Sequence, residues 1–258
     1  MRVFVATHAR LSLWIAMIPG FVVLIGGLSL FGSEAGLWLY ALFAVWLLTA
    51  FVWINRQAHR LTKPAMEALD HRCDPQPLLD VCRTVLRQNP DSLYFRVHEA
   101  YALTLLGQEE EGRAAAERAA RNRSLWKNPA LALLWSACAA EEDPRQQTAV
   151  NTLKQAGQKL PPATREKLEQ YLLRRRALQE LGKAPEELET PLLEGLERAG
   201  CLREQVGAHL ALGAYYCERK NLKAEEHLRF VLEHANRMRG TITQAERLLC
   251  LLPAPKQN

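Results

Sequence analysis

Hydrophobic residues follow two contrasting patterns along the chain. Near the N-terminus they form two long runs: 23 residues without a charge separate Arg10 from Glu34, and 21 separate Glu34 from Arg56. Leu, Ile, Val and Phe dominate both runs. Each run has the roughly 20 residues that a helix needs to cross a hydrocarbon core about 30 Å thick. The pattern therefore predicts two transmembrane helices, over about 11–33 and 35–55.

The charges around these runs predict how the hairpin is oriented. Cations flank it on both outer sides, and the tight turn expected over 31–36 carries only Glu34. The flanking cations are Arg2 and Arg10 before the first run, and Arg56, Arg60 and Lys63 after the second. The positive-inside rule therefore places both termini in the cytoplasm of a bacterial-type inner membrane, although an organellar membrane would suit the same hydropathy. The three cations after the second run form a membrane-interface set that would attract anionic lipid.

A cleaved signal peptide is the alternative interpretation of the first run. Its apolar region is too long for that role, and a second apolar run follows at once. Neither run contains Asp, Glu, His, Lys or Arg, which proton relays and ion sites in membranes require. The hairpin is therefore expected to be an anchor, with Gly20, Gly26 and Gly27 as a surface for helix packing.

From about Leu61 onward, apolar residues recur at spacings of three and four, as in Leu228, Val231 and Leu232, and no strand pattern is convincing. Helix-breaking residues interrupt this pattern every 34 to 40 positions, with a second set of breaks about midway between. The first set is Cys73-Asp74-Pro75, Gly107, Asp143-Pro144, Gly182 and Lys220-Asn221; the second is Asn89-Pro90, Asn128-Pro129, Leu160-Pro161-Pro162 and Ala199-Gly200. A helix–turn–helix unit with this period predicts an α-solenoid.

Several short strings resemble the tetratricopeptide repeat (TPR) family. Val81–Asp91, which ends in a proline turn, resembles the close of such a unit, and Ala100-Tyr101-x-Leu103-x-x-x-Gly107 resembles the first helix of the next. Leu212-Gly213-Ala214-Tyr215-Tyr216 is the most family-like string. Further matches are Cys82, Val85 and Leu86; Ala137, Ala149, Leu153, Ala156 and Pro161; and Leu222, Ala224 and Leu228. Arg96 and Glu99 depart from the family pattern, because they replace side chains that the family usually packs.

Together, the apolar runs and the resemblance predict an all-α chain in two parts: a transmembrane hairpin over 1–58 and, as the resemblance implies, a cytoplasmic TPR-like solenoid of antiparallel helix pairs over 59–258. The expected units lie near 59–92, 93–126, 130–163 and 206–238, with a looser unit over 164–199 and a capping helix over Thr241–Leu252. A generic helical-repeat solenoid is the fallback, and it buries its apolar faces in the same way.

In TPR proteins the first helix of each pair lines a concave, peptide-binding face. Carried over by the repeat register, the partner-binding residues would be Tyr94, Val97, Tyr101, Leu131, Leu134 and Cys138. The set is aromatic and aliphatic, which favours an apolar-anchored segment over a clamped carboxylate. The alternative is that these residues are ordinary packing between helices.

Composition and motifs narrow the function further. The net charge of +5 is spread thinly, without the concentrated basic face that nucleic acids require. Six cysteines form no C-x-x-C pair, His98-Glu99 lacks the second histidine of H-E-x-x-H, and no P-loop, G-x-S-x-G or G-x-G-x-x-G occurs. No metal, cofactor or enzymatic activity is therefore expected. Arg174-Arg175-Arg176 could dock a phosphate or a lipid headgroup, but nearby acidic residues favour a solvated helix face.

These observations predict a membrane-anchored scaffold or adaptor that binds a protein partner through its cytoplasmic solenoid. Tethering would raise the effective concentration of the solenoid near other membrane components, so that a weak contact suffices. The rival prediction is a structural subunit of a larger membrane complex, docked through the hairpin.

Overall fold

Every element that the computed structural model assigns is helical. The structure describes residues 9–31, 36–139, 143–155, 157–181, 183–217, 219 and 221–252. The chain divides into two compact units, one of residues 1–64 and 83–92, the other of residues 65–82 and 93–258. The expected all-α class is confirmed, and each unit is described in turn.

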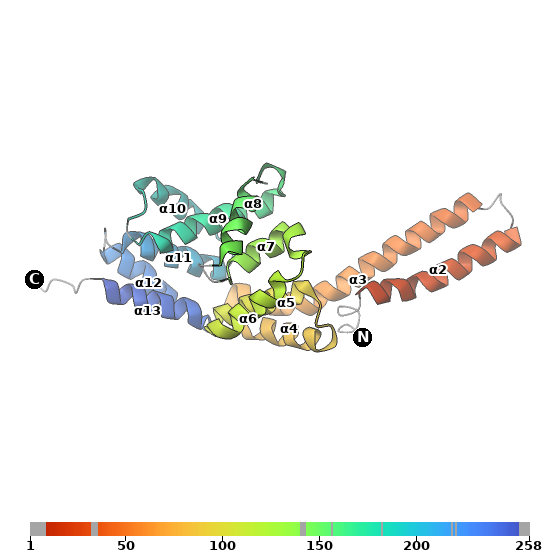
Figure 1. The fold of residues 1–258 in the computed structure, drawn as a ribbon, viewed down its shortest axis with the longest axis horizontal. Coiled ribbons are helices and arrows are strands. Elements are labelled where there is room, and N and C mark those ends of the chain that lie inside the picture. The colour runs from red at the N-terminus through yellow and green to blue at the C-terminus, as the bar shows by residue number, and fades with distance from the viewer. Residues whose placement is uncertain are drawn as a thin grey trace, which may run out of the picture. The chain divides into compact units, whose positions relative to one another are not determined.

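The first unit contains a hairpin of α2 (Ala9–Phe31) and α3 (Gly36–Arg72), which lie side by side (Figure 1). Glycines let the two helices approach closely. A Cβ at Gly20 would lie 2.8 Å from the Phe43 ring, and one at Gly27 would lie 2.8 Å from Leu39. The indole of Trp46 donates to the Ala16 carbonyl oxygen at 2.8 Å. The expected packing role thus fits these two glycines, whereas a Cβ at Gly26 would meet nothing within 4 Å.

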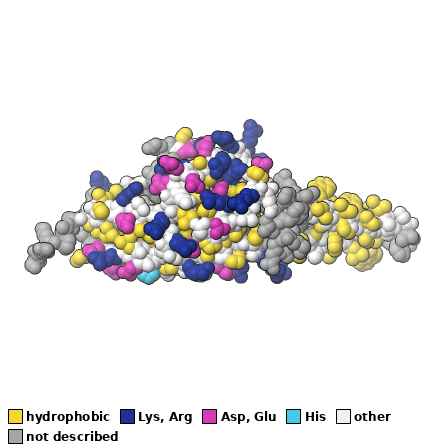
Figure 2. Space-filling model, turned by 90° about the horizontal axis from the view of Figure 1, so that it is seen from below, with side chains coloured by type: hydrophobic (Ala, Val, Ile, Leu, Met, Phe, Trp, Pro, Cys, Tyr) yellow, Lys and Arg dark blue, Asp and Glu magenta, His cyan; other side chains and the backbone are white. Residues whose placement is uncertain are grey.

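Large apolar side chains cover the described surface of this hairpin. Trp14, Val22, Trp38 and Leu48 are 65%, 65%, 73% and 65% exposed. Figure 2 shows hydrophobic side chains over the hairpin, whereas Lys, Arg, Asp and Glu side chains are interspersed over the helices that follow it. Among the described residues, however, none of the helices combines the length and the apolar character needed to cross a membrane. The two expected transmembrane spans are therefore not found, although helices occupy both ranges.

The expected boundary at 58/59 falls inside a helix, because α3 runs on without interruption through Pro64 to Arg72. Residues 32–35 of the expected turn lie outside the described residues. Cys73 follows α3 with a φ of 49°, a left-handed conformation that commonly ends a helix. After this break, α4 spans Gln76–Gln88.

The second unit continues as consecutive helix pairs, which confirms the paired helices expected from the spacing of the breaks. The pairs are α5 (Leu93–Leu105) with α6 (Glu109–Ala120), α7 (Pro129–Ser136) with α8 (Pro144–Gln155), α9 (Pro162–Gln179) with α10 (Glu189–Glu197), and α11 (Leu202–Tyr216) with α12 (Asn221–His234), followed by α13 (Arg239–Leu251). Short 3-10 helices are η2 (Leu125–Lys127), η3 (Gly157–Lys159) and η4 (Glu186–Leu188). The expected terminal helix is therefore present as α13. The breaks at Gly182 and Lys220 lie outside the described residues.

Local sequence explains several of these helix ends. Gly107 has a φ of 77°, which suits glycine and lets the chain turn between α5 and α6. Asn128 caps α7: its side-chain oxygen accepts a hydrogen bond from the Leu131 amide at 3.2 Å. Pro129 follows at the first helical position, where the missing N–H costs nothing.

The beginning and the end of the second unit are in contact. The Asn236 side chain donates to the Arg72 carbonyl oxygen at 2.7 Å, and the Arg237 amide donates to the Cys73 carbonyl oxygen at 3.3 Å. Cys73 is fully buried in the same core cluster as Val206 and Leu228. The end of α3 and the segment between α12 and α13 are therefore neighbours, although 164 positions separate Arg72 from Asn236.

Candidate partner-binding surface

The six residues expected on a concave binding face lie on α5, on α7 and directly after α7. Their exposure differs widely. Tyr94 is 41% exposed, whereas Val97 is fully buried and Cys138 is 5% exposed. The remaining three, Tyr101, Leu131 and Leu134, are half-buried. Helices α5 and α7 are in contact, so the structure brings the set to neighbouring elements. Its role in binding a partner stays a prediction, and Val97 and Cys138 contribute to packing.

A polar cluster surrounds Tyr101. The Arg203 guanidinium, on α11, donates from Nη1 to the Tyr101 hydroxyl at 3.2 Å and from Nε to Asp70 Oδ1 at 2.8 Å. Interaction with Tyr101, followed by the hydrogen bond to Asp70, raises the pKa of Arg203. The cluster joins α3, α5 and α11. Tyr101 is thus already engaged by its own chain.

Arg174, on α9, places a second guanidinium beside this cluster. Its Nε atom is buried, and no partner for it is found among the described residues. Burial lowers the pKa of Arg174, and the nearby charge of Arg203 lowers it further, while Glu204 raises it. A Cβ at Gly207 would lie 3.0 Å from Arg174 Nη1, so the glycine leaves room for this side chain. The guanidinium groups of Arg174 and Arg203 therefore lie near Tyr101, on the face that the sequence pattern predicts to be apolar.

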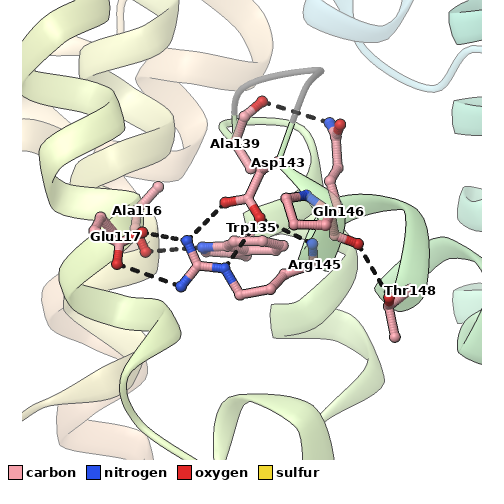
Figure 3. A network of polar contacts seen from close by, with 9 residues as sticks. Ala116, Glu117, Trp135, Ala139, Asp143, Arg145, Gln146 and Thr148 are labelled. Carbon is pink, nitrogen blue, oxygen red and sulfur yellow. Dashed lines mark hydrogen bonds and ion pairs between the residues drawn. The ribbon is translucent and has the colours of Figure 1, made fainter.

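A second network joins the start of α8 to α6 (Figure 3). Arg145 donates to Asp143 from Nε at 3.0 Å and from Nη2 at 2.7 Å, and it also bonds both carboxylate oxygens of Glu117. These hydrogen bonds lower the pKa of both carboxyl groups. Beside them, the fully buried Trp135 donates to the Ala116 carbonyl oxygen at 2.8 Å. The network acts as a structural tie between adjacent helix pairs.

A third set of contacts links α7, α8 and α9. Gln146 and Tyr171 both donate to the Ser136 carbonyl oxygen, at 2.7 and 3.0 Å. Arg175 donates from Nη2 to Gln146 Oε1 at 3.2 Å, but its Nη1 atom is buried and has no partner within the described residues. Arg175 thus leaves one of its strong donor groups unsatisfied at the edge of this network.

Arg175 also lines an open pocket of about 600 Å³, which we name the α8–α9 pocket. Its other lining residues come from α8, α9 and η4: Gln147, Val150, Lys154, Glu169, Leu172, Leu173, Arg176, Gln179 and Leu188. A volume of this size is in the range of ordinary ligand sites. The lining combines an aliphatic floor with cationic edges, so it has the features of a recognition site.

Covalent and metal chemistry find little support in the described residues. Burial raises the pKa of Cys73 to about 11 and of Cys82 and Cys138 to about 12, so these thiols are protonated at neutral pH. No group of three or more His, Cys, Asp or Glu side chains that could hold a metal ion occurs in the part of the chain that the structure describes.

The chain matches no protein-family model, no curated protein and no solved structure. Fold and function therefore rest on its own residues.

The run Arg174-Arg175-Arg176 differs in part from the solvated helix face that the sequence favours. Only Arg176 is on a solvated helix face, where it pairs with Glu180 at 3.0 Å. Arg174 and Arg175 instead each have a buried nitrogen without a partner among the described residues. Arg174 is three positions from Tyr171 and Arg175 is three from Leu172, and this spacing was the available signal, because residues three apart share a helix face.

Proposed function

We propose that this protein is a membrane-anchored helical-repeat scaffold, similar in plan to TPR proteins. It binds a protein partner on the cytoplasmic side through its second compact unit (residues 65–82 and 93–258), which we call the helical unit. The observation that carries the proposal is the concentration of exposed large apolar side chains on the hairpin of α2 and α3. Contiguous apolar surface of this kind marks a membrane or protein interface. Because both runs lack charges, lipid acyl chains are the cover that fits best.

The helical unit supplies the recognition surface in this proposal. Its helix pairs stack as in other repeat proteins, which commonly bind segments of partner proteins. Arg56 and Arg60 are exposed just after the apolar part of α3, where anionic headgroups would attract them. Lys63, the third member of this membrane-interface set, is exposed as well.

An anchor swap tests the proposal. Residues 1–58 are replaced by an unrelated two-helix membrane anchor, joined in helical register because α3 continues across this position. Both proteins are purified in mild detergent after cross-linking, and their bound proteins are compared by mass spectrometry. We expect the same principal partner with both anchors. Alkaline carbonate extraction checks in parallel that the natural hairpin keeps the protein with the membrane.

A structural subunit docked through its hairpin is the second candidate, since the same exposed apolar surface could be covered by another integral protein. It predicts that the partner disappears with the swapped anchor. Tyr94→Ala then tests the α5 surface of the scaffold: a scaffold that uses α5 loses capture. Trp126→Ala is the control, because Trp126 is also about 40% exposed but lies on η2.

A further inference from the structure

The α8–α9 pocket has two matching helix faces. On α8, Gln147, Val150 and Lys154 follow at spacings of three and four. On α9, the lining residues from Glu169 to Gln179 recur at the same helical spacings. Residues so spaced share one face of a helix. The pocket is therefore lined by the facing surfaces of α8 and α9, with Leu188 of η4 completing it.

The floor of the pocket is aliphatic. Val150 and Leu188 are 3% and 6% exposed, and Leu172 and Leu173 are half-buried. Such a floor favours a branched or aromatic side chain, because transfer of that side chain from water to an apolar surface is favourable.

The edges of the pocket are cationic. The lining contains three cationic side chains, those of Lys154, Arg175 and Arg176, and one acidic side chain, that of Glu169. Arg176 is already paired with Glu180, but Lys154 is exposed and has no ion pair among the residues that the structure describes. The charge of the lining is thus positive on balance, which complements an acidic ligand.

The positive charge of Arg175 has a fixed place in the lining. The Nη2 atom of Arg175 is bound to Gln146 Oε1, which holds the guanidinium in place, while the buried Nη1 atom has no acceptor in the described structure. A carboxylate is the acceptor that matches the planar guanidinium.

We propose that the α8–α9 pocket binds an acidic, apolar-anchored segment of a protein partner. A Leu, Ile or Phe side chain of the segment rests on the aliphatic floor, and an Asp or Glu nearby is attracted by the cationic side chains of Lys154 and Arg175. The facing helix surfaces suit a segment with several consecutive contacts, as in other helix-lined peptide sites. This inference rests on the proposed scaffold function and names the partner chemistry.

Peptide display on the full-length protein in nanodiscs tests the inference. The probe is a random library of peptides about twelve residues long, and enriched peptides are then labelled with fluorescein for anisotropy measurements. We expect enriched sequences with Asp or Glu three or four positions from Leu, Ile or Phe, the spacing at which helical side chains share a face. Their affinity should fall as salt is raised, since exposed charges are screened.

Substitutions inside and outside the α8–α9 pocket test where the peptides bind. Arg175→Lys keeps the charge but loses the planar fork, so affinity should fall about tenfold. Lys154→Glu should lower it about fivefold. Lys167→Glu, on α9, is the matched control: this lysine is also exposed but does not line the pocket, and affinity should not change. Lys154 is exposed and unpaired, so its variant is not expected to disturb the fold.

Two results would overturn the inference: enriched peptides without acidic residues, or equal loss of binding in Lys154→Glu and Lys167→Glu. Binding of vesicles rich in anionic lipid at the pocket, in place of peptides, would also reject it. The proposed scaffold function is judged separately. If the partner from the anchor-swap assay is still captured by Lys154→Glu and Arg175→Lys, the scaffold function stands and the pocket is not its site.

Discussion

At the scale of single residues, the clearest pH-sensitive feature is a histidine pair. The Nδ1 atoms of His209 and His227 are 2.8 Å apart, so one ring donates and the other accepts. Burial, together with the nearby His227 and His234, lowers the pKa of His209 to about 4, and burial also lowers the pKa of His227. Lys223 lowers the pKa of His227 further, while Glu226 raises it. The native pair is therefore neutral at physiological pH.

This pair predicts a loss of stability in acid. Because the folded pKa lies below the unfolded value near 6.5, the unfolded state takes up the proton first. The contribution is complete above pH 6.5 and is lost as the pH falls towards 4. With allowance for partial solvent access, the loss should be on the order of 1–2 kcal/mol, or about 3–6 °C in Tm, by circular dichroism in detergent.

His209→Gln should reduce the fall in Tm between pH 6.5 and 4, because the glutamine amide does not titrate. The exposed His71→Gln variant is the control and should keep the full pH dependence. If Tm of His209→Gln falls with pH as steeply as that of the natural protein, the histidine pair is not the cause.

The half-buried Arg203 supports a second prediction at this scale. Arg203 and Asp70 are 23% and 29% exposed in their side chains, so solvent screens their interaction only in part. Arg203→Gln leaves Asp70 and the Tyr101 hydroxyl without their donor, and it should lower the free energy of unfolding by about 1–3 kcal/mol in urea. Tyr101→Phe removes one acceptor and should cost about 1 kcal/mol. An Arg203→Gln variant within 0.5 kcal/mol of the natural protein would show that the cluster is not structural.

At the scale of helices, one close approach in the helical unit joins α11 to α12. A Cβ at Gly213 would lie 2.6 Å from Leu228 Cδ2, inside the family-like string that starts at Leu212. Gly213→Ala should therefore destabilise by about 1–3 kcal/mol, despite the better helix propensity of alanine. Gly157→Ala is the control, because a Cβ there meets nothing within 4 Å. Thermal unfolding of both variants checks the difference, and equal Tm values would contradict the close approach.

The sequence predicts elements better than it predicts the contacts between them. Proline and glycine act locally, so Gly107 and Asn128-Pro129 mark the helix ends correctly. The uninterrupted α3 was missed, because the end of the second apolar run does not end the helix, which continues past residues 58 and 59. The tie between Arg203 and Asp70 spans 133 positions, and no periodicity within one helix reports such a pairing. The apolar groove expected from α5 and α7 was therefore predicted without the cations that α9 and α11 bring to it.

At the scale of the whole molecule, Cys250 can report the orientation of the helical unit. It is the exposed cysteine of the described chain, whereas Cys201 is half-buried and the other four are buried. Burial also raises the pKa of Cys201, which slows its reaction with maleimides. If the unit lies in the cytoplasm, a membrane-impermeant maleimide should leave intact spheroplasts unlabelled and label about one thiol per chain after lysis. Cys250→Ser should remove that signal.

The same reagent tests whether the hairpin crosses the bilayer. Ser33→Cys, introduced into Cys250→Ser, places a thiol in the turn expected between the two apolar runs. A hairpin that crosses the membrane exposes this thiol on the far side, so intact spheroplasts should become labelled. A hairpin that only lies in the inner leaflet leaves it unlabelled until lysis. Labelling of Cys250 itself in intact spheroplasts would place the helical unit outside the cell and would contradict the cytoplasmic scaffold.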